Sequence, residues 1–314
     1  AYAQQQAAYQ QQAEHAAYQQ YYAQAQYAQQ QQQQQPQPNA LGSMASKLQE
    51  RAEKQKQKLE KAMRKESKGG NREIAGADAT VGQSARRRFI KKTYTHLFFA
   101  IVTFALLLFV FRTVEPFPTL LQPFVDFALG GRWNWGVVLA AYVGVSFICD
   151  RWASNAKSRK MQYLGLGFYV LAEAVIFVPL LAVVAWKTQD IVARGGGEPN
   201  IVRDAAFMTL GTFAFLTLSV LVSKKDFSFL RSGLFAASGA AMTLIVLSLM
   251  FGFNLGLVFS VGMVVLASGY ILMQTSQILA HYDPESHVAA SLALFSSIAL
   301  MFWYMIRIVM RAKD

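Results

Sequence analysis

The sequence predicts an all-α, polytopic membrane protein in which a disordered N-terminal extension precedes a bundle of seven transmembrane helices. The chain of 314 residues is 54% hydrophobic and only 15% charged, whereas soluble proteins are typically about 25% charged. Seven apolar runs approach the roughly 20 residues that a helix needs to cross a bilayer. These runs are continuously apolar rather than alternating, which argues against the strands of a membrane barrel.

The predicted spans fill the C-terminal part of the chain, residues 93–314, which we interpret as one transmembrane domain. Short connections between the spans leave no room for a soluble domain. The second span is short, and polar residues interrupt the seventh. The spans cover about 94–114, 134–150, 162–186, 203–223, 231–252, 255–280 and 287–310.

The residues before the first span divide into three segments by composition. Residues 1–43 form a tail rich in Gln, Ala and Tyr, with too few aliphatic side chains to offset chain entropy by burial, so we expect disorder. Residues 44–68 are rich in Lys and Glu with apolar residues at helical spacing, which predicts a charged helix. Residues 69–92 read as a polar linker that ends in a basic juxtamembrane segment.

Much of the net charge of +12 belongs to the segment directly before the first span, which is not the pattern of a nucleic-acid-binding domain. A basic cluster next to an apolar run fits contact with anionic lipid headgroups, at about 1 kcal/mol per basic residue. A topology signal alone accounts for the same residues equally well. The cluster consists of Arg86, Arg87, Arg88, Lys91 and Lys92.

The distribution of Lys and Arg among the loops predicts a cytoplasmic N-terminus, because cytoplasmic loops are enriched in basic residues. The stretch 151–160 and the connection 224–231 lie on the same predicted side as the basic cluster. With seven spans, Arg307, Arg311 and Lys313 would lie on the opposite side. A seventh segment that only re-enters the membrane is therefore an open alternative.

Glu173 is the most informative polar residue of the predicted spans, because it lies near the middle of the third one. A carboxylate there costs about 2.5 to 3.5 kcal/mol, so it should face the bundle interior or a water-filled cavity. Pro179 deprives the Val175 carbonyl of its helical donor, which suggests a small hydrated pocket. Alternatively, Glu173 is structural and accepts a hydrogen bond from Gln274 or a hydroxyl.

Polar side chains on the sixth and seventh predicted spans should face each other, because the two spans are hairpin neighbours. The polar side chain considered on the sixth span is Gln274, and those on the seventh are Ser296 and Ser297. Hydrogen bonds between membrane helices average about 0.6 kcal/mol, so a structural role suffices to account for them. A hydrated route for a small solute or ion is the alternative.

The sequence predicts neither a metal site, nor a cofactor, nor an enzyme. His281, Asp283, Glu285 and His287 have metal-ligand side chains, but Asp-Pro-Glu is equally a helix start with acids near the positive dipole end. We discount the metal interpretation. No G-x-S-x-G or H-E-x-x-H motif of a hydrolase occurs, and His96 reads as a packed or interfacial histidine.

Several segments resemble the Bax inhibitor-1 family, in particular its YccA-type bacterial branch. The resemblance covers about residues 85–310 and leaves out the tail and the charged helix. The motifs in chain order are RRRFIKKTYTHL (Arg86–Leu97), YVLAEAVIFVPLL (Tyr169–Leu181), KKDFSFLRSGL (Lys224–Leu234), GYILMQTSQILAHY (Gly269–Tyr282) and AASLALFSSIALMFWYMIRIV (Ala289–Val309).

The resemblance implies seven helices with the last one central, and a leak of Ca²⁺ or protons that pH controls in some family members. That control is attributed to one aspartate in each of the last two helices, and the matching positions here are Gln274 and Ser297. Two close carboxylates share a proton and titrate as a pair, whereas Gln and Ser do not titrate. We therefore expect the fold to carry over without this pH control.

Two functions follow as expectations from the resemblance and the polar residues. The first is a channel or leak pathway for Ca²⁺, H⁺ or other small cations through the bundle. The second is a regulatory membrane protein that does not transport and binds a partner, such as a membrane-bound protease or a stress or cell-death factor. The expected location is the bacterial cytoplasmic (inner) membrane, or an organelle membrane if the source is eukaryotic.

Overall fold

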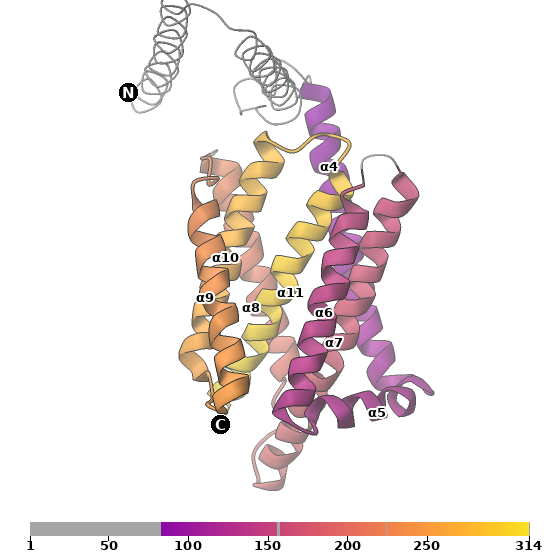
Figure 1. The fold of residues 1–314 in the computed structure, drawn as a ribbon, viewed down its shortest axis with the longest axis vertical. Coiled ribbons are helices and arrows are strands. Elements are labelled where there is room, and N and C mark those ends of the chain that lie inside the picture. The colour runs from indigo at the N-terminus through magenta and orange to yellow at the C-terminus, as the bar shows by residue number, and fades with distance from the viewer. Residues whose placement is uncertain (1–82, 156–157, 224, 314) are drawn as a thin grey trace, which may run out of the picture. The chain divides into compact units, whose positions relative to one another are not determined.

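The computed structural model describes residues 83–155, 158–223 and 225–313, and these residues form helices without a strand (Figure 1). The predicted tail 1–43, the charged helix 44–68 and the linker up to residue 82 lie outside the described residues. The helices are α4 (Gln83–Thr113), α5 (Phe117–Leu129), α6 (Arg132–Ala153), α7 (Arg159–Ala193), α8 (Ile201–Ser223), α9 (Leu230–Phe251), α10 (Gly256–Ala280) and α11 (His287–Ala312).

Seven of the described helices are long and apolar enough to cross a membrane, which confirms the predicted fold class. Their bounds differ most from the prediction where helices continue beyond the apolar run. α4 begins at Gln83, so the basic cluster belongs to its first turns. α7 has 35 residues, or about 52 Å at 1.5 Å per residue, and exceeds the hydrocarbon core of about 30 Å.

α5 is the one described helix that the sequence analysis missed. It has 13 residues, too few to span a bilayer. In Figure 1 it lies across the direction of the spans, at the end of the bundle opposite the start of α4, and it packs against α4, α6 and α7. Its sequence begins with Pro116 at the N-cap and a proline in the first turn, a composition that favours a helix start.

α11 is the central helix of the bundle. It packs against α4, α6, α7, α8 and α10, and 67% of its most apolar stretch is buried, against 0% for α9. Its 26 residues form one continuous helix of about 39 Å, and its C-terminal end lies at the end of the bundle opposite the start of α4 (Figure 1). An unbroken helix of this length favours a full crossing over a segment that re-enters the membrane.

Aromatic side chains from three helices fill the centre of the bundle around Phe104 of α4. Its ring lies edge-to-face against Phe177 of α7 at 5.0 Å and against Phe295 of α11 at 5.6 Å between ring centroids. Phe302, two turns further along α11, stacks on Phe177 at 5.5 Å. Such pairs contribute about 0.5 to 1.5 kcal/mol beyond their buried area, so they hold α4 and α7 against the central helix.

Gly165 permits the closest approach between α6 and α7. A Cβ atom at this position would lie 2.5 Å from the Ala153 nitrogen and 2.6 Å from the Cys149 carbonyl oxygen. Both atoms are backbone and cannot rotate away. Membrane helices are held together largely by close van der Waals packing of this kind, so Gly165 fixes the position of α6 on α7.

We predict that Gly165→Ala destabilises the bundle by about 1 to 3 kcal/mol, the usual cost of overpacking. The matched control is Gly167→Ala on the same helix, where no atom lies within 4 Å of the added Cβ. Because Ala is a better helix former by about 1 kcal/mol, the control should leave stability unchanged or raise it. Unfolding free energies of both variants in detergent micelles test this, and equal stabilities would contradict it.

Candidate functional site

A buried carboxylate with two tyrosine partners lies where α6 meets α7. Glu173 of α7 is only 5% exposed. The Tyr142 hydroxyl of α6 donates a hydrogen bond to Glu173 Oε2. The Tyr169 hydroxyl, one turn before Glu173, lies 3.1 Å from that of Tyr142 and also faces the carboxylate. Among the described residues, Glu173 is the only acidic side chain that is buried.

The tyrosines make Glu173 tolerable inside the membrane, because hydroxyl donors replace water around the carboxylate. Of the two partners that the sequence suggested, a hydroxyl or Gln274, the structure places hydroxyls at Glu173. Sequence reasoning missed Tyr142 and Tyr169. Tyr169 was detectable, because a residue four positions before Glu173 lies on the same helix face, whereas Tyr142 is 31 residues away in the chain.

Gln274 and Ser297 join α10 to α11 at a second polar contact. The Ser297 hydroxyl donates to Gln274 Oε1 at 3.0 Å, and both side chains are buried. The structure thus brings together the two positions where the resemblance implies aspartates. The pair is neutral and hydrogen-bonded at this contact, so it needs no charge compensation.

Ser296 connects the two polar contacts, because it precedes Ser297 on α11 and its hydroxyl lies beside that of Tyr169. It also donates to the Ala293 carbonyl at 2.9 Å. The central helix therefore reaches both Tyr169, which faces the carboxylate, and the amide of Gln274. We call this set the polar seam; its members are Tyr142, Tyr169, Glu173, Gln274, Ser296 and Ser297.

Further buried polar atoms lie between α4, α8 and α10, toward the end of the bundle where α4 begins. The Tyr94 hydroxyl faces those of Thr217 and Thr275. None of the three hydroxyls, nor Gln277 Nε2, has a well-formed hydrogen bond within the described part of the chain. Buried polar groups of this kind typically bind water, so this end of the bundle can hydrate.

Pro179 lies buried within α7, six residues after Glu173, and α7 continues through it as one helix. The missing amide leaves the Val175 carbonyl without its usual helical donor. Pro179 therefore adds an acceptor on the same helix as Glu173 but does not interrupt the span.

Arg86 does not lie with the exposed members of the basic cluster, which corrects the expectation that it contacts lipid headgroups. Its side chain is 5% exposed, and it donates to the Tyr282 carbonyl at 2.7 Å and to the Ala280 carbonyl at 3.3 Å. Ala280 is the last residue of α10 and Tyr282 follows two residues later, at the helix end where the dipole favours a cation. Arg86 thus caps α10.

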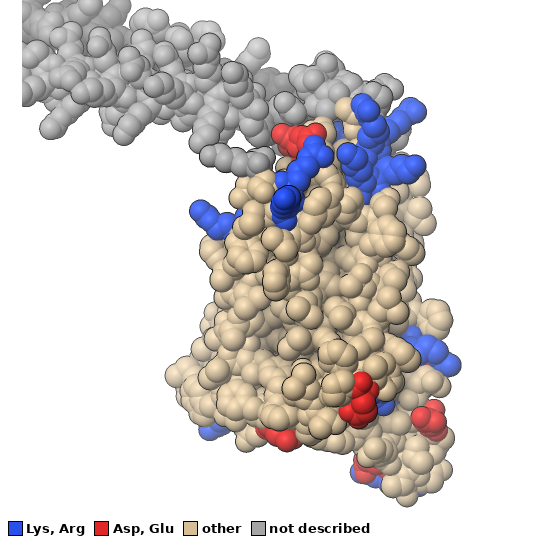
Figure 2. Space-filling model, turned by 90° about the vertical axis from the view of Figure 1, so that its right-hand side faces the viewer, with Lys and Arg blue, Asp and Glu red and all other residues tan. Residues whose placement is uncertain are grey.

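The helical register of α4 accounts for the difference between Arg86 and its neighbours. Phe89, Thr93 and Leu97 follow it at spacings of three and four residues, and all three are buried. This spacing was the available signal, although a run of like charges conceals it. The other cluster members, Arg87, Arg88, Lys91 and Lys92, are exposed. In Figure 2, Lys and Arg gather at this end of the bundle, and most of the acidic groups in view lie at the other.

The junction between α8 and α9 is attached to the end of α10. Asp226 Oδ1 accepts the Ser228 amide at 2.8 Å, and Asp226 Oδ2 lies 3.8 Å from His281 Nε2. The Phe227 amide donates to the Ser276 hydroxyl at 3.1 Å. Partial desolvation raises the pKa of Asp226, but the Ser228 hydrogen bonds and His281 outweigh it and lower the pKa overall. Asp226 is therefore ionised at neutral pH.

The four residues considered as a metal site are engaged in contacts that do not form a common ligand set. Asp283 Oδ1 accepts the Glu285 amide at 3.0 Å, and Glu285 pairs with Arg159 at 2.6 Å. The His287 ring packs against His96 at 5.1 Å between centroids. In the described residues, no three His, Cys, Asp or Glu side chains are grouped to hold a metal. Asp283 caps a turn rather than α11, which begins four residues later.

Comparison with known proteins agrees with this architecture. The family described as "Inhibitor of apoptosis-promoting Bax1" matches residues 86–314. A Golgi anti-apoptotic protein of vaccinia virus (strain Lister) is 30% identical over 117 residues, which are 36% of this chain and 48% of that protein. An uncharacterized protein of Pseudomonas aeruginosa is 33% identical over 116 residues, or 36% of this chain and 52% of that protein.

A third relative is Bax inhibitor 1 of Schizosaccharomyces pombe, 32% identical over 115 residues, which are 35% of this chain and 42% of that protein. The chain spans about half the length of the curated relatives it matches. The family match, by contrast, extends over all seven candidate spans. The chain is therefore a member of the Bax inhibitor-1 family of integral membrane proteins.

Proposed function

We propose that this protein is a closed leak pathway for Ca²⁺ or another small cation, and that the pathway runs along the polar seam. The observation that carries the proposal is Glu173, a carboxylate buried inside a membrane-spanning bundle and held by hydroxyls of two helices. Ionisable residues at such positions commonly mark ion or proton paths, because burying them has a cost that packing alone does not require.

Opening requires the Tyr142 hydroxyl to leave Glu173. While that hydrogen bond is present, a hydroxyl donor occupies one acceptor position of the carboxylate and stands where a cation would bind. A shift of α6 against α7 would free the carboxylate and expose it to cations. The unsatisfied hydroxyls of Tyr94, Thr217 and Thr275 support a hydrated vestibule on the side where α4 begins.

The gate of this pathway does not depend on a titrating pair at the last two helices. Gln274 and Ser297 form a neutral hydrogen bond, and neither side chain changes charge with pH. We further propose that the protein resides in a bacterial inner membrane with its N-terminus in the cytoplasm. The basic end of the bundle (Figure 2) and the Pseudomonas aeruginosa relative support this placement.

A second candidate is a regulatory role without transport, through binding of a membrane partner. The exposed surface of α9 favours it, because none of the most apolar stretch of that helix is buried by the bundle. Phe235, for example, is 78% exposed. Two relatives are named for anti-apoptotic or Bax-inhibiting action, which is consistent with a stress or cell-death factor as the partner.

For the leak pathway, we predict that Glu173→Leu lowers cation flux at least tenfold in liposomes of purified protein, because the cation loses its attracting charge. Tyr142→Phe should raise flux, because it removes the donor that occupies the carboxylate. Glu198→Gln in the exposed loop before α8 is the control and should match the wild type. Fluorescent Ca²⁺ and pH indicators inside the liposomes provide the measurement. Identical flux in wild type and Glu173→Leu would reject the role of Glu173.

For the neutral pair, we predict that the double variant Gln274→Asp, Ser297→Asp acquires pH-dependent flux. At low pH the two carboxyls share a proton and keep α10 and α11 joined; at higher pH both ionise and repel. Flux of the double variant should therefore rise with pH, while the wild type shows no change from this pair. Ser297→Asn is the matched control. Superimposable pH profiles of all three proteins would argue against the assignment of these positions.

For the regulatory candidate, we predict that a photo-crosslinking amino acid at Phe235 of α9 captures one discrete partner in native membranes. The control position is Phe215, which is 69% exposed and belongs to a different helix, α8. The crosslinker at Phe215 should react only with lipid. Recovery of uncrosslinked monomer from both positions would count against partner binding through α9.

A further inference from the structure

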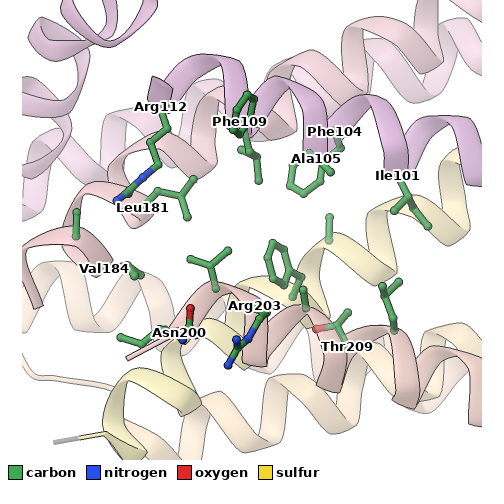
Figure 3. Close-up of a pocket in the computed structure, with 18 of the residues that line it drawn as sticks. Ile101, Phe104, Ala105, Phe109, Arg112, Leu181, Val184, Asn200, Arg203 and Thr209 are labelled. Carbon is green, nitrogen blue, oxygen red and sulfur yellow. The ribbon is translucent and has the colours of Figure 1, made fainter. Parts of the chain in front are cut away.

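A cavity of about 560 Å³ lies between α4, α7, α8 and α11, and none of the six polar-seam residues lines it (Figure 3). Its size is within the range of about 300 to 1,000 Å³ that is typical of small-molecule sites. Phe109 of α4 and Leu210 of α8 line it and are 61% and 44% exposed. The cavity is therefore open to the flank of the bundle, which faces lipid.

The floor of the cavity is apolar. It is formed by Phe104, Leu181, Val184 and Phe302, all of which are buried. Along α4 the lining runs from Ile101 to Arg112, a distance of about 16 Å at 1.5 Å per residue. Half of a hydrocarbon core of about 30 Å is about 15 Å, so the cavity has the depth of one leaflet.

The charged residues of the lining lie toward one end of the cavity. Arg112 near the end of α4 and Asn200 and Arg203 near the start of α8 lie toward this end, while Ile101 and Thr209 lie toward the other (Figure 3). Arg112 lies in the last turn of α4 and Arg203 in the first turn of α8. Because the ends of membrane-spanning helices lie near the edge of the hydrocarbon region, we expect this end of the cavity at the level of the lipid headgroups.

The charge at this end favours an anion. Arg112 has no hydrogen bond or ion pair to any residue that the structure describes, whereas Arg203 pairs with Asp204 at 3.2 Å. Glu198 is the one acid of the lining. Asp204 lies outside the lining and also pairs with Lys313 at 3.7 Å, so three basic groups stand against two acids at this end. The first amides of α8, which have no acceptor within the helix, add the positive end of its dipole.

We propose that this cavity binds one anionic phospholipid of the surrounding leaflet. One acyl chain lies along the apolar floor between α4 and α8, and the phosphate is held by Arg112 and the N-terminal end of α8. Depth, polarity and charge all select this occupant over a neutral lipid or a soluble ligand. The lining shares no residue with the polar seam, and the test measures lipid contact, so it does not depend on whether the protein conducts ions.

The test uses purified full-length protein in nanodiscs with a phosphatidylglycerol that carries a photoreactive diazirine midway along one acyl chain. After irradiation, mass spectrometry of peptides locates the label. We expect labelling of the peptides that contain Ala299 and Phe302 at least fivefold above the peptides of α9, which lie on the perimeter. Uniform labelling of all lipid-facing helices would overturn the proposal.

Two pairs of variants test the binding of the acyl chain and the binding of the headgroup separately. Ala206→Phe fills the cavity and should abolish the focused labelling, whereas Ala214→Phe lies on the same helix outside the lining and should not. Arg112→Gln should lower the preference for phosphatidylglycerol over phosphatidylcholine of the same chains about fivefold. Arg194→Gln, an exposed arginine at the same end of the bundle, is its control.

The Arg112 arm remains informative if Ala206→Phe does not fold, because Arg112 is exposed and its loss leaves the packing intact. An unchanged lipid preference in Arg112→Gln would overturn the headgroup assignment. Focused labelling that is equal for phosphatidylglycerol and phosphatidylcholine would likewise reject an anionic site.

Discussion

The structure depends on one constraint: a polar group inside the bilayer must find its hydrogen-bond partner in the protein or in water that the protein encloses, because lipid tails offer none. Glu173 meets this requirement through Tyr142 of a neighbouring helix, so the carboxylate fixes α6 against α7. The Ser297 to Gln274 bond does the same for α10 and α11. The polar contacts thus determine which helices are neighbours, and aromatic packing and the close approach at Gly165 then set their distances.

The central helix is the element that both polar contacts share. Ser296 and Ser297 are successive residues, and successive residues on an α-helix point about 100° apart. Ser296 therefore reaches Tyr169 of α7, while Ser297 reaches Gln274 of α10. A rotation of α11 about its own axis that breaks the contact of Ser296 with Tyr169 would therefore also disturb the bond of Ser297 to Gln274. In the proposed pathway this linkage would couple the freeing of Glu173 to the pairing of the last two helices.

The sequence predicted the spans well because soluble folds seldom contain about 20 apolar residues in succession. It missed α5, whose 13 residues are too short for that criterion, and it misplaced Arg86, whose charge gives no sign of its burial. Glu173 was found because a carboxylate in an apolar run is conspicuous. Its partner Tyr142 was not, since the packing of α6 on α7 depends on a glycine contact that composition does not reveal.

The capping of α10 by Arg86 gives the start of α4 a mechanical link to the far end of the chain. Its guanidinium joins the first turns of α4 to carbonyls nearly 200 positions later. These carbonyls lie close in the chain to Ser276 of α10, which binds the junction between α8 and α9. A pull on the polypeptide before Arg86 would act through this side chain on the end of α10. Force applied there would thus act on the hairpin that carries Gln274, rather than on the membrane surface alone.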